Sequence, residues 1–506
     1  MAKLENLRIL AKTVDKNKVK NIHIIGNSNS SNSVSDYFYE ALLANKFQRD
    51  DEYKEFLYPN QVKNKAYYKL KDRLQERLIN TLFFIDTNNQ DYSPISKAYY
   101  NCHKKLAAIK ILLGKTARKP AINLAHKVIQ KSIEFTFTDI TLELAKILRL
   151  HYGVSAGDEK KFDYYNNLVH INISVYQAEL KAEEYYAHIC SFYVKSTLIN
   201  TRILPIIEKY ITELNELNNK YSSYRLYIHH KSLLMIYFEM QKNKWNELLD
   251  LCNDIINYYT LNSKFASSNL VSITLLRKVE CLFFLRRFKE GEEIAIQGLN
   301  LGVKESLNWF FIADIYFILL LHSKQFNKAK DIFISVNKNN HINNKFHHER
   351  KKIQEAFIHY LLRIGKIKEQ PGDKKLKPFR LGKFLNEMPV YSKDKRGSNI
   401  TILILQILFL LEDKKYNTII DRAESLKSYT HRYLKEDETY RSNCFIKMLL
   451  CLPETGFQKD KTLKKAKKYI DLLHAVPLEK ARQSPEVEVM PYEVLWEFAL
   501  DSLDRQ

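Results

Sequence analysis

The scarcity of turn-forming residues is the feature of this sequence that most limits its fold. Only 12 glycines and 11 prolines occur among 506 residues, whereas average usage is roughly 7% and 5% of a chain. Both residue types are poor helix formers, and Leu, Lys and Glu, which favour helices, are abundant. Hydrophobic residues make up 45% of the chain, which is enough to build a core. The composition therefore predicts a mostly helical, folded chain.

A chain of this length exceeds the size at which one compact core keeps growing, so several domains or an extended array are expected. From about residue 97 onward one pattern recurs: an apolar helix, a short polar or basic turn, an aromatic or aliphatic anchor, and a second amphipathic helix. In residues 311–336 the anchor is Phe326, and Ala329 and Phe333 share its helix face. Further anchors, at intervals of about 38 to 49 residues, are Trp245, Phe288 and Tyr416 and, more weakly, Ile367 and Leu463.

This turn-plus-anchor pattern resembles tetratricopeptide-type repeats over about residues 97–490. In that family a small residue of the second helix lets the two helices pack closely, as Ala329 and Ala466 could do here. The first-helix signature of the family is not reproduced, and the spacing exceeds its usual 34 residues. The resemblance implies an all-α fold: an α-solenoid of about 8–9 TPR-like helical hairpins with a concave face open to a ligand. The alternative is an irregular multi-helix domain without a continuous groove.

Composition divides the chain into three predicted parts. Residues 1–90 form a small, mainly helical domain, residues 91–490 the repeat array, and residues 491–506 an acidic capping helix. Within the array, residues 366–383 contain two prolines, two glycines and many lysines, which predicts a basic loop, either a solvated linker or a binding element. From Gln483 to Asp504 there are acidic residues and no basic ones, as expected for a closing helix with a polar outer face.

The first ninety residues differ from the array. The stretch IHIIGNSNSSNS (22–33) indicates a short extended piece and a polar loop. It lacks the later glycines of the G-x-G-x-x-G dinucleotide fingerprint, so no dinucleotide site is predicted there. Ser35 and Asp36 are expected to cap a helix that runs toward Asn45.

A helix after Asn64 is expected to have two different faces. Its apolar stripe consists of Tyr67, Leu70, Leu74 and Leu78, and a basic row on another face consists of Lys65, Lys69, Arg73 and Arg77. With the extended LFFID (82–86), these helices are compatible with a helix-turn-helix or winged-helix module whose recognition helix turns the basic row toward DNA. Alternatively, Asp72 and Glu76 pair with the row on a solvated helix.

Gly114-Lys115-Thr116 has the ending of a phosphate-binding loop. The full motif needs a glycine at position 109, where Ile109 stands, and a preceding strand, whereas residues 101–113 have helical amphipathic character. The sequence therefore predicts a hairpin turn, in which Gly114 ends the first helix and Thr116 caps the next. Pro120 is expected in the first turn of that next helix.

A basic patch surrounds this turn. Between Tyr92 and Ile133 there are nine basic residues and no acidic ones. Lys119, Lys127 and Lys131 share one helix face with Asn123, opposite an apolar face. The patch is therefore available to a polyanion or an acidic protein segment, unless acids of an adjacent hairpin cover it. The candidate partner-binding residues are Lys104, Lys105, Lys115, Arg118, Lys119, Lys127 and Lys131.

No motif indicates catalysis, a cofactor or a bound metal. His347-His348 is not followed by the second histidine of H-E-x-x-H. There is no G-x-S-x-G elbow, and the six cysteines are scattered without a C-x-x-C pair, as in proteins of a reducing compartment. We therefore expect no catalytic residues, no cofactor and no metal, although a catalytic site assembled from distant residues leaves no motif in the sequence.

The charge balance points to a partner. There are 80 Lys and Arg against 58 Asp and Glu, a net charge of +22, which favours nucleic acid, anionic membrane or acidic protein partners or a basic, solvated surface. The N-terminus has no apolar signal core, and the longest apolar runs are shorter than the roughly 20 residues that span a bilayer. A cytoplasmic protein without a transmembrane segment is expected.

The hypothesis from sequence is a non-enzymatic helical-repeat adaptor or scaffold that binds a protein, a peptide or a polyanion. The alternative is a nucleic-acid-binding regulator that uses the basic N-terminal region and the 92–133 patch. A third hypothesis is a catalytic protein whose site is not visible in sequence.

Overall fold

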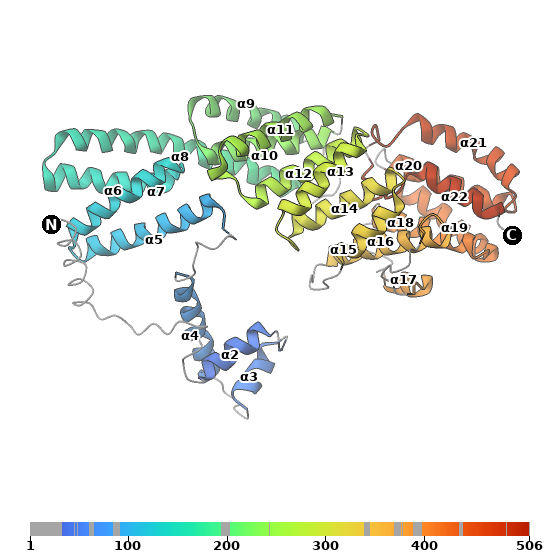
Figure 1. Ribbon diagram of the computed structural model, residues 1–506, viewed down its shortest axis with the longest axis horizontal. Helices are drawn as coiled ribbons and strands as arrows, with labels where there is room; N and C mark the ends of the chain where they lie inside the picture. Colours follow the sequence, from blue (N-terminus) through green and yellow to red (C-terminus); the bar gives the residue numbers. More distant parts are fainter. Residues whose placement is uncertain are drawn as a thin grey trace. The chain divides into compact units, whose positions relative to one another are not determined.

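A computed structural model describes residues 33–59 (except 45 and 48), 65–83, 92–193, 203–337 (except 242), 345–368, 376–387 (except 377), 397–434 and 439–504 (except 482). Within these ranges every regular element is a helix and there is no strand (Figure 1). The all-helical fold predicted from composition is therefore confirmed. The chain forms two compact units, residues 1–181 with 221–224 (unit 1) and residues 182–220 with 225–506 (unit 2).

The elements of unit 1 are α2 (Val34–Leu43), α3 (Asp50–Leu57), α4 (Lys65–Leu82), α5 (Pro94–Gly114), α6 (Arg118–Glu134), α7 (Thr138–Leu150), the π-helix η1 (His151–Ala156) and α8 (Glu159–Tyr193), whose last residues belong to unit 2. Those that follow are α9 (Leu204–Lys220), α10 (Tyr224–Gln241), α11 (Trp245–Leu261), the short η3 (Ser263–Phe265), α12 (Ser268–Phe284), α13 (Phe288–Leu301), α14 (Leu307–His322), α15 (Phe326–Val336), α16 (Lys345–Arg363), α17 (Leu381–Glu387), α18 (Ser398–Glu412), α19 (Tyr416–Tyr433), α20 (Tyr440–Glu454), α21 (Lys459–Ala475) and α22 (Tyr492–Asp504).

Helices α2, α3 and α4 form a small module with its own core, made of Phe38, Ala41, Tyr53, Tyr67 and Leu74. The predicted cap is displaced: Ser33, not Ser35, caps α2. The Ser33 hydroxyl accepts from the Asp36 amide (3.3 Å), and the Asp36 carboxylate accepts from the Ser33 amide (3.1 Å), which is a capping box. The predicted extended pieces at 22–33 and 82–86 lie largely outside the described residues.

The turn between α5 and α6 differs from the prediction in its detail. Gly114 is the last residue of α5, and it is Thr116 that adopts the left-handed conformation (φ 58°). The Ala117 amide donates to the Leu112 carbonyl (2.9 Å) and the Thr116 amide to the Leu113 carbonyl (3.1 Å), the two bonds of a Schellman motif. Thr116 does not cap α6, because its hydroxyl donates to the carbonyl of Lys115 (2.7 Å).

The same turn joins other helix pairs along the chain. Arg286, Lys324 and Lys414 have φ between 53° and 59°, and the amides of each and of the residue after it make the same pair of backbone bonds at the end of a helix. The next helix then starts two residues later, at Phe288, Phe326 and Tyr416. These anchors, and Trp245 at the start of α11, lie where the sequence pattern predicted a second helix. The two weaker anchors differ: the predicted helix at Leu463 is present as α21 but begins earlier, at Lys459, and Ile367 follows α16 without starting a helix.

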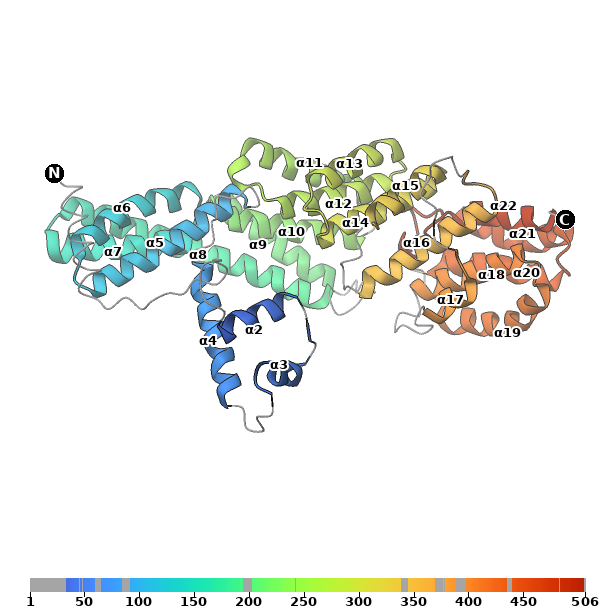
Figure 2. The same ribbon diagram turned by 60° about the horizontal axis from the view of Figure 1, so that its bottom comes forward.

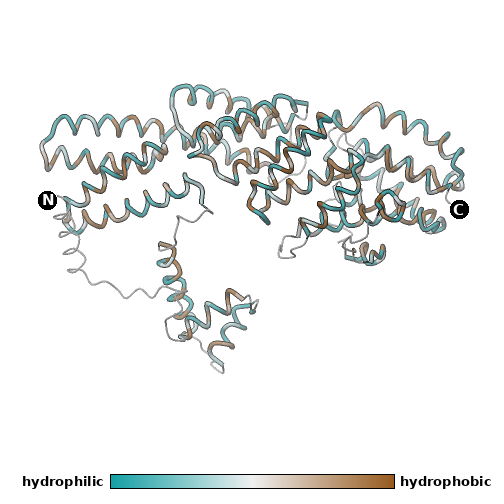
Figure 3. Tube along the Cα trace, viewed as in Figure 1, coloured by the Kyte–Doolittle hydropathy of each residue, from teal (hydrophilic) through white to brown (hydrophobic). Residues whose placement is uncertain are grey.

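Packing in unit 2 follows chain order. Each helix from α11 to α16 contacts the next, α18 to α21 do likewise, and α16 contacts α18 (Figure 1). Alternate helices also touch, as α12 touches α14 and α18 touches α20. Hydrophobic residues cover most of α14 and α18 (Figure 3), as expected for helices buried on all sides. Ala329 and Ala466 are fully buried, consistent with close helix packing.

The last helix, α22, lies among the helices of unit 2. It packs against α18, α20 and α21 (Figure 2), and most of its side chains are buried, including Trp496 and Phe498. Among residues 492–504 only Glu497, Asp501 and Asp504 are exposed. The acidic outer face expected of a closing helix is therefore a narrow strip.

A buried ion pair fixes the segment that leads into α22. The Arg441 guanidinium in α20 binds the Glu488 carboxylate through Nε (2.8 Å) and Nη2 (2.7 Å). Nη1 donates to the carbonyls of Leu473 (3.0 Å) and Val476 (2.7 Å), and Nη2 also binds Glu493. Every donor of the guanidinium therefore has an acceptor, and the Arg441 and Glu488 side chains are 2% and 0% exposed.

Acidification is expected to destabilise unit 2. Burial lowers the pKa of His322 and of His230 to about 4, from an ordinary 6.5. Between these values the unfolded chain takes up protons that the folded chain does not, so the stabilisation is complete above about pH 6.5 and declines as the pH falls toward 4. Each histidine then lowers the free energy of unfolding by about 1.4 kcal/mol per pH unit.

Urea unfolding at about pH 7.5 and about pH 5 measures this decline. His322→Gln removes one of these two groups and leaves His230, so it should show a shallower decline than the parent chain. An equal decline in both proteins would contradict the assignment.

Candidate functional site

The predicted basic patch lies on α5 and α6 of unit 1. On α6, Lys119, Lys127 and Lys131 are exposed together with Asn123, and the opposite face is buried. Lys104, Lys105, Lys115 and Arg118 are also exposed. All seven candidate residues therefore present their side chains to solvent, although their surroundings differ.

Acidic residues cover part of the patch. Lys131 pairs with Glu134 (3.0 Å), and Lys110 pairs with Glu143 of α7 (2.9 Å). Hydrogen bonds from Lys146 and Lys110 lower the pKa of the Glu143 carboxyl group, which keeps it charged. The Lys104 amino group donates to the Phe83 carbonyl (2.8 Å). The hypothesis that acids of a neighbouring helix cover the patch thus holds for Lys110, whereas Lys131 is paired with an acid of its own helix, α6.

Three lysines of the patch remain without an acid. Among the residues that the structure describes, none forms an ion pair with Lys105, Lys115 or Lys127. Arg118, at the start of α6, donates to the Ser155 hydroxyl of η1, which sets η1 beside the first turn of α6. The positive field of the patch is therefore strongest around the α5–α6 turn and the exposed face of α6.

A cluster of aromatic and basic side chains borders α6 and was not found from sequence. Both ring nitrogens of His126 form hydrogen bonds, Nε2 with the Tyr152 hydroxyl (2.7 Å) and Nδ1 with the Tyr165 hydroxyl (3.2 Å). Lys161 of α8 lies 4.8 Å from the centre of the Tyr152 ring and pairs with Asp158 (3.0 Å). Burial, with the charge of Lys161, lowers the pKa of His126. No sequence signal could reveal this cluster, because its members come from three separate segments.

The predicted DNA-facing row of α4 divides into two parts. Lys65, Lys69 and Arg73 are exposed. Arg77 is half-buried and donates to the Ser35 hydroxyl of α2 (2.9 Å). Arg77 therefore has a structural role within the three-helix module, and three basic residues remain on the outer face.

A second basic surface, on α21, was missed from sequence. Lys461, Lys464, Lys467 and Lys468 are exposed, while Lys465 pairs with Glu454 of α20 (2.8 Å) and Lys459 pairs with Asp504 of α22. Asp460 and Asp471 interrupt this helix, so it does not stand out as an acid-free stretch. The density of its lysines alone would have revealed it.

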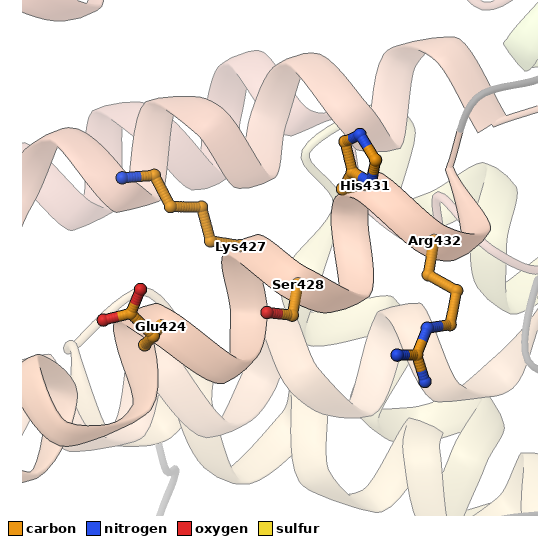
Figure 4. A pocket seen from close by; sticks show the side chains of 5 residues that line it. All are labelled: Glu424, Lys427, Ser428, His431 and Arg432. Atoms are coloured by element: carbon orange, nitrogen blue, oxygen red, sulfur yellow. The ribbon is translucent and has the colours of Figure 1, made fainter.

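Two of the hollows on the described part of unit 2 are shallow and open to solvent. The first, of about 540 Å³, is lined only by residues of α19, namely Glu424, Lys427, Ser428, His431 and Arg432. Lys427 and Arg432 point to different sides of the helix (Figure 4), so these side chains do not converge on one ligand. The second, of about 470 Å³, is lined by Asn243, Trp245, Phe284, Leu285, Arg286, Glu479 and Lys480.

Within the described ranges, no three His, Cys, Asp or Glu side chains gather as metal ligands would. The side chains of His347 and His348 lie outside the described residues, as do residues 369–375 and 377 of the predicted basic loop, and its last residues, 381–383, begin α17. The final part of the predicted loop packs against α18, because the Phe379 ring stacks on the Phe409 ring (4.9 Å between ring centres). No described helix combines the length and apolar character needed to cross a membrane.

The described part of the chain is all-helical and carries exposed basic side chains on α4, on α5–α6 and on α21. Comparisons with protein-family models, curated proteins and solved structures find no match.

Proposed function

We propose that this chain is a helical-repeat adaptor, which binds an acidic partner and catalyses no reaction. The proposed architecture is an α-solenoid of TPR-like hairpins. It is supported by the contacts between successive and alternate helices in unit 2 and by the Schellman turn that recurs between helix pairs. In such arrays each repeat contacts mainly its neighbours, and long surfaces remain for a partner.

The observation that carries the proposal is the group of exposed lysines on α5–α6 without an acid. Lys105, Lys115 and Lys127 have no carboxylate partner among the described residues, in a stretch whose acids are few. A partner with many negative charges would replace the counterions that these lysines attract, and the release of those counterions favours binding. An acidic protein segment and nucleic-acid phosphates share this chemistry.

Reversing these three charges is expected to weaken binding of an acidic partner strongly. The variant Lys105→Glu, Lys115→Glu, Lys127→Glu is compared with the parent chain, using a fluorescent polyglutamate peptide and a duplex DNA as probes at several salt concentrations. We expect affinity to fall at least about tenfold at low salt. With DNA, the slope of log affinity against log salt should decrease by about one for each lysine that no longer neutralises a phosphate.

The matched control places the same charge change on the other basic surface. The variant Lys461→Glu, Lys464→Glu, Lys468→Glu has an identical net charge and is expected to bind nearly as the parent does. If both triple variants lose affinity equally, binding depends on net charge alone and the proposed site on α5–α6 is wrong.

A nucleic-acid-binding regulator is the second candidate. It is favoured by one observation: Lys65, Lys69 and Arg73 are exposed at intervals of four residues along α4, as on a helix that faces phosphates. Exposed Asp72 and Glu76 lie beside them. In the duplex-DNA assay, reversal of these three positive charges would lower affinity only if α4 takes part.

A further inference from the structure

The segment between α21 and α22 crosses several helices of unit 2 without forming a helix itself. Glu479 pairs with Arg286 (3.2 Å), which follows α12. Further along, Glu486 pairs with Arg350 of α16, and Glu488 pairs with Arg441 of α20. Residues far apart in sequence thus meet along one short stretch of chain.

Side chains of the helices also bind the backbone of this segment. The Thr401 hydroxyl in α18 donates to the Val487 carbonyl (2.9 Å), and the His322 ring in α14 contacts the Glu488 carbonyl through Nε2 (2.9 Å). Burial lowers the pKa of His322, so the ring is neutral at pH 7 and this nitrogen carries its proton when it donates. Two consecutive carbonyls are therefore bound by two different helices, as the backbone of a bound peptide would be.

The other side chains of the segment fill the space among these helices. Val487, Val489 and Met490 are buried. The Gln483 side-chain carbonyl accepts from the amide (3.0 Å) and hydroxyl (2.8 Å) of Ser442, and its amino group donates to Glu488 (2.8 Å). Apolar positions thus alternate with Glu486 and Glu488, each of which binds an arginine.

We propose that residues 483–491 are a peptide ligand supplied by the chain itself, and that α14, α16, α18 and α20 form a binding track for an acidic, non-helical segment. Arg441 binds the carboxylate of residue 488, and Arg350 binds that of residue 486. Thr401 and His322 form hydrogen bonds to the backbone carbonyls of residues 487 and 488. The occupant is the chain's own segment, so this track differs from the α5–α6 patch and is independent of it.

The complementary charges and the burial support this occupant. Arg441 is the largest fully buried side chain among the described residues, and its charge is matched by Glu488 and Glu493. Without the segment, the buried guanidinium would lose the Glu488 carboxylate and keep only Glu493 of α22, at a high cost in free energy. The folded state of these helices is therefore stable only while an acidic segment is bound to them.

Cleavage of the chain beside the segment tests the proposal. A recognition sequence for a site-specific protease is inserted between Ala481 and Gln483 of the full chain, the purified protein is cut, and gel filtration shows whether residues 483–506 stay bound. A labelled peptide of residues 483–506 is then added in excess, and its exchange into the cut protein is followed by fluorescence anisotropy.

The expected result is retention of the cut segment and slow exchange with the labelled peptide. A peptide with Glu488→Gln should bind at least about 100-fold more weakly, whereas one with Glu497→Gln, an exposed glutamate of α22, should bind as the parent peptide does. Equal affinity of the Glu488→Gln and parent peptides would overturn the proposal, and so would cut protein that unfolds and takes up neither peptide.

Hydrogen exchange of the uncut chain gives a second measurement. If residues 483–491 are a bound ligand, their amides should exchange through a local opening while α18 and α20 stay protected. Exchange of the segment only together with α18 and α20, in one cooperative unfolding, would show that it is part of the core and would also overturn the proposal.

Discussion

Replacing Arg441 with methionine is expected to lower the free energy of unfolding of unit 2 by about 3–5 kcal/mol. The substitution leaves the Glu488 carboxylate, which is 0% exposed, without its bidentate partner. The carbonyls of Leu473 and Val476 also lose their donors. Urea unfolding followed by circular dichroism measures the loss.

Two control variants separate charge from packing. The double variant Arg441→Met, Glu488→Met leaves neither member of this buried pair without its partner. It should therefore be more stable than either single variant. Arg441→Lys keeps the charge but not the planar fork that binds two oxygens and two carbonyls, and should still be clearly destabilised. If Arg441→Met and the double variant are equally unstable, the ion pair is not the cause.

Ending the chain after Met490 is expected to make unit 2 insoluble or unfolded. The truncation removes α22, whose buried apolar side chains include Tyr492, Leu495, Trp496 and Phe498. Burial of each such side chain contributes about 1.5–3 kcal/mol, so their combined loss is of the same size as the roughly 5–15 kcal/mol that stabilise a domain. It also exposes the apolar faces of α18, α20 and α21.

Yield of soluble protein and the melting temperature measure this effect. The control is Glu497→Lys with Asp501→Lys, which changes the exposed strip of α22 and leaves its buried face intact; this protein should remain soluble with a nearly unchanged melting temperature. A truncated protein that folds as the parent does would show that α22 is an appendage and not part of the core.

Local patterns were enough to predict a helical chain and the start of four of its helices. The anchors Trp245, Phe288, Phe326 and Tyr416 start helices as expected, because the alternation of apolar and polar residues depends on the 3.6-residue helical period. The detail of the turn was wrong at Thr116. The Schellman motif places the residue after the helix cap in the left-handed conformation, and here that residue is not glycine.

The candidate site was predicted only in part, since charge depends on neighbours in space. The acid-free stretch ends at Ile133, yet the next residue, Glu134, pairs with Lys131 from one helical turn away. Glu143 reaches Lys110 from another helix. Arg77 was placed in a DNA-facing row by its spacing, but its position beside α2 gives it a partner in Ser35.

The amino-acid pattern alone establishes that this chain is helical, where the turns before Trp245, Phe288, Phe326 and Tyr416 lie and which faces of some helices are apolar, because these properties depend on residues within a few positions of one another. Tertiary structure alone decides which charges are paired and where residues 477–504 lie. Glu488 and Arg441 are 47 residues apart, and the alternation of Glu486 and Glu488 with apolar residues does not by itself say which helices segment 483–491 packs against. Its place among α14, α16, α18 and α20 is set by buried charge and shape, which act only once those helices have come together.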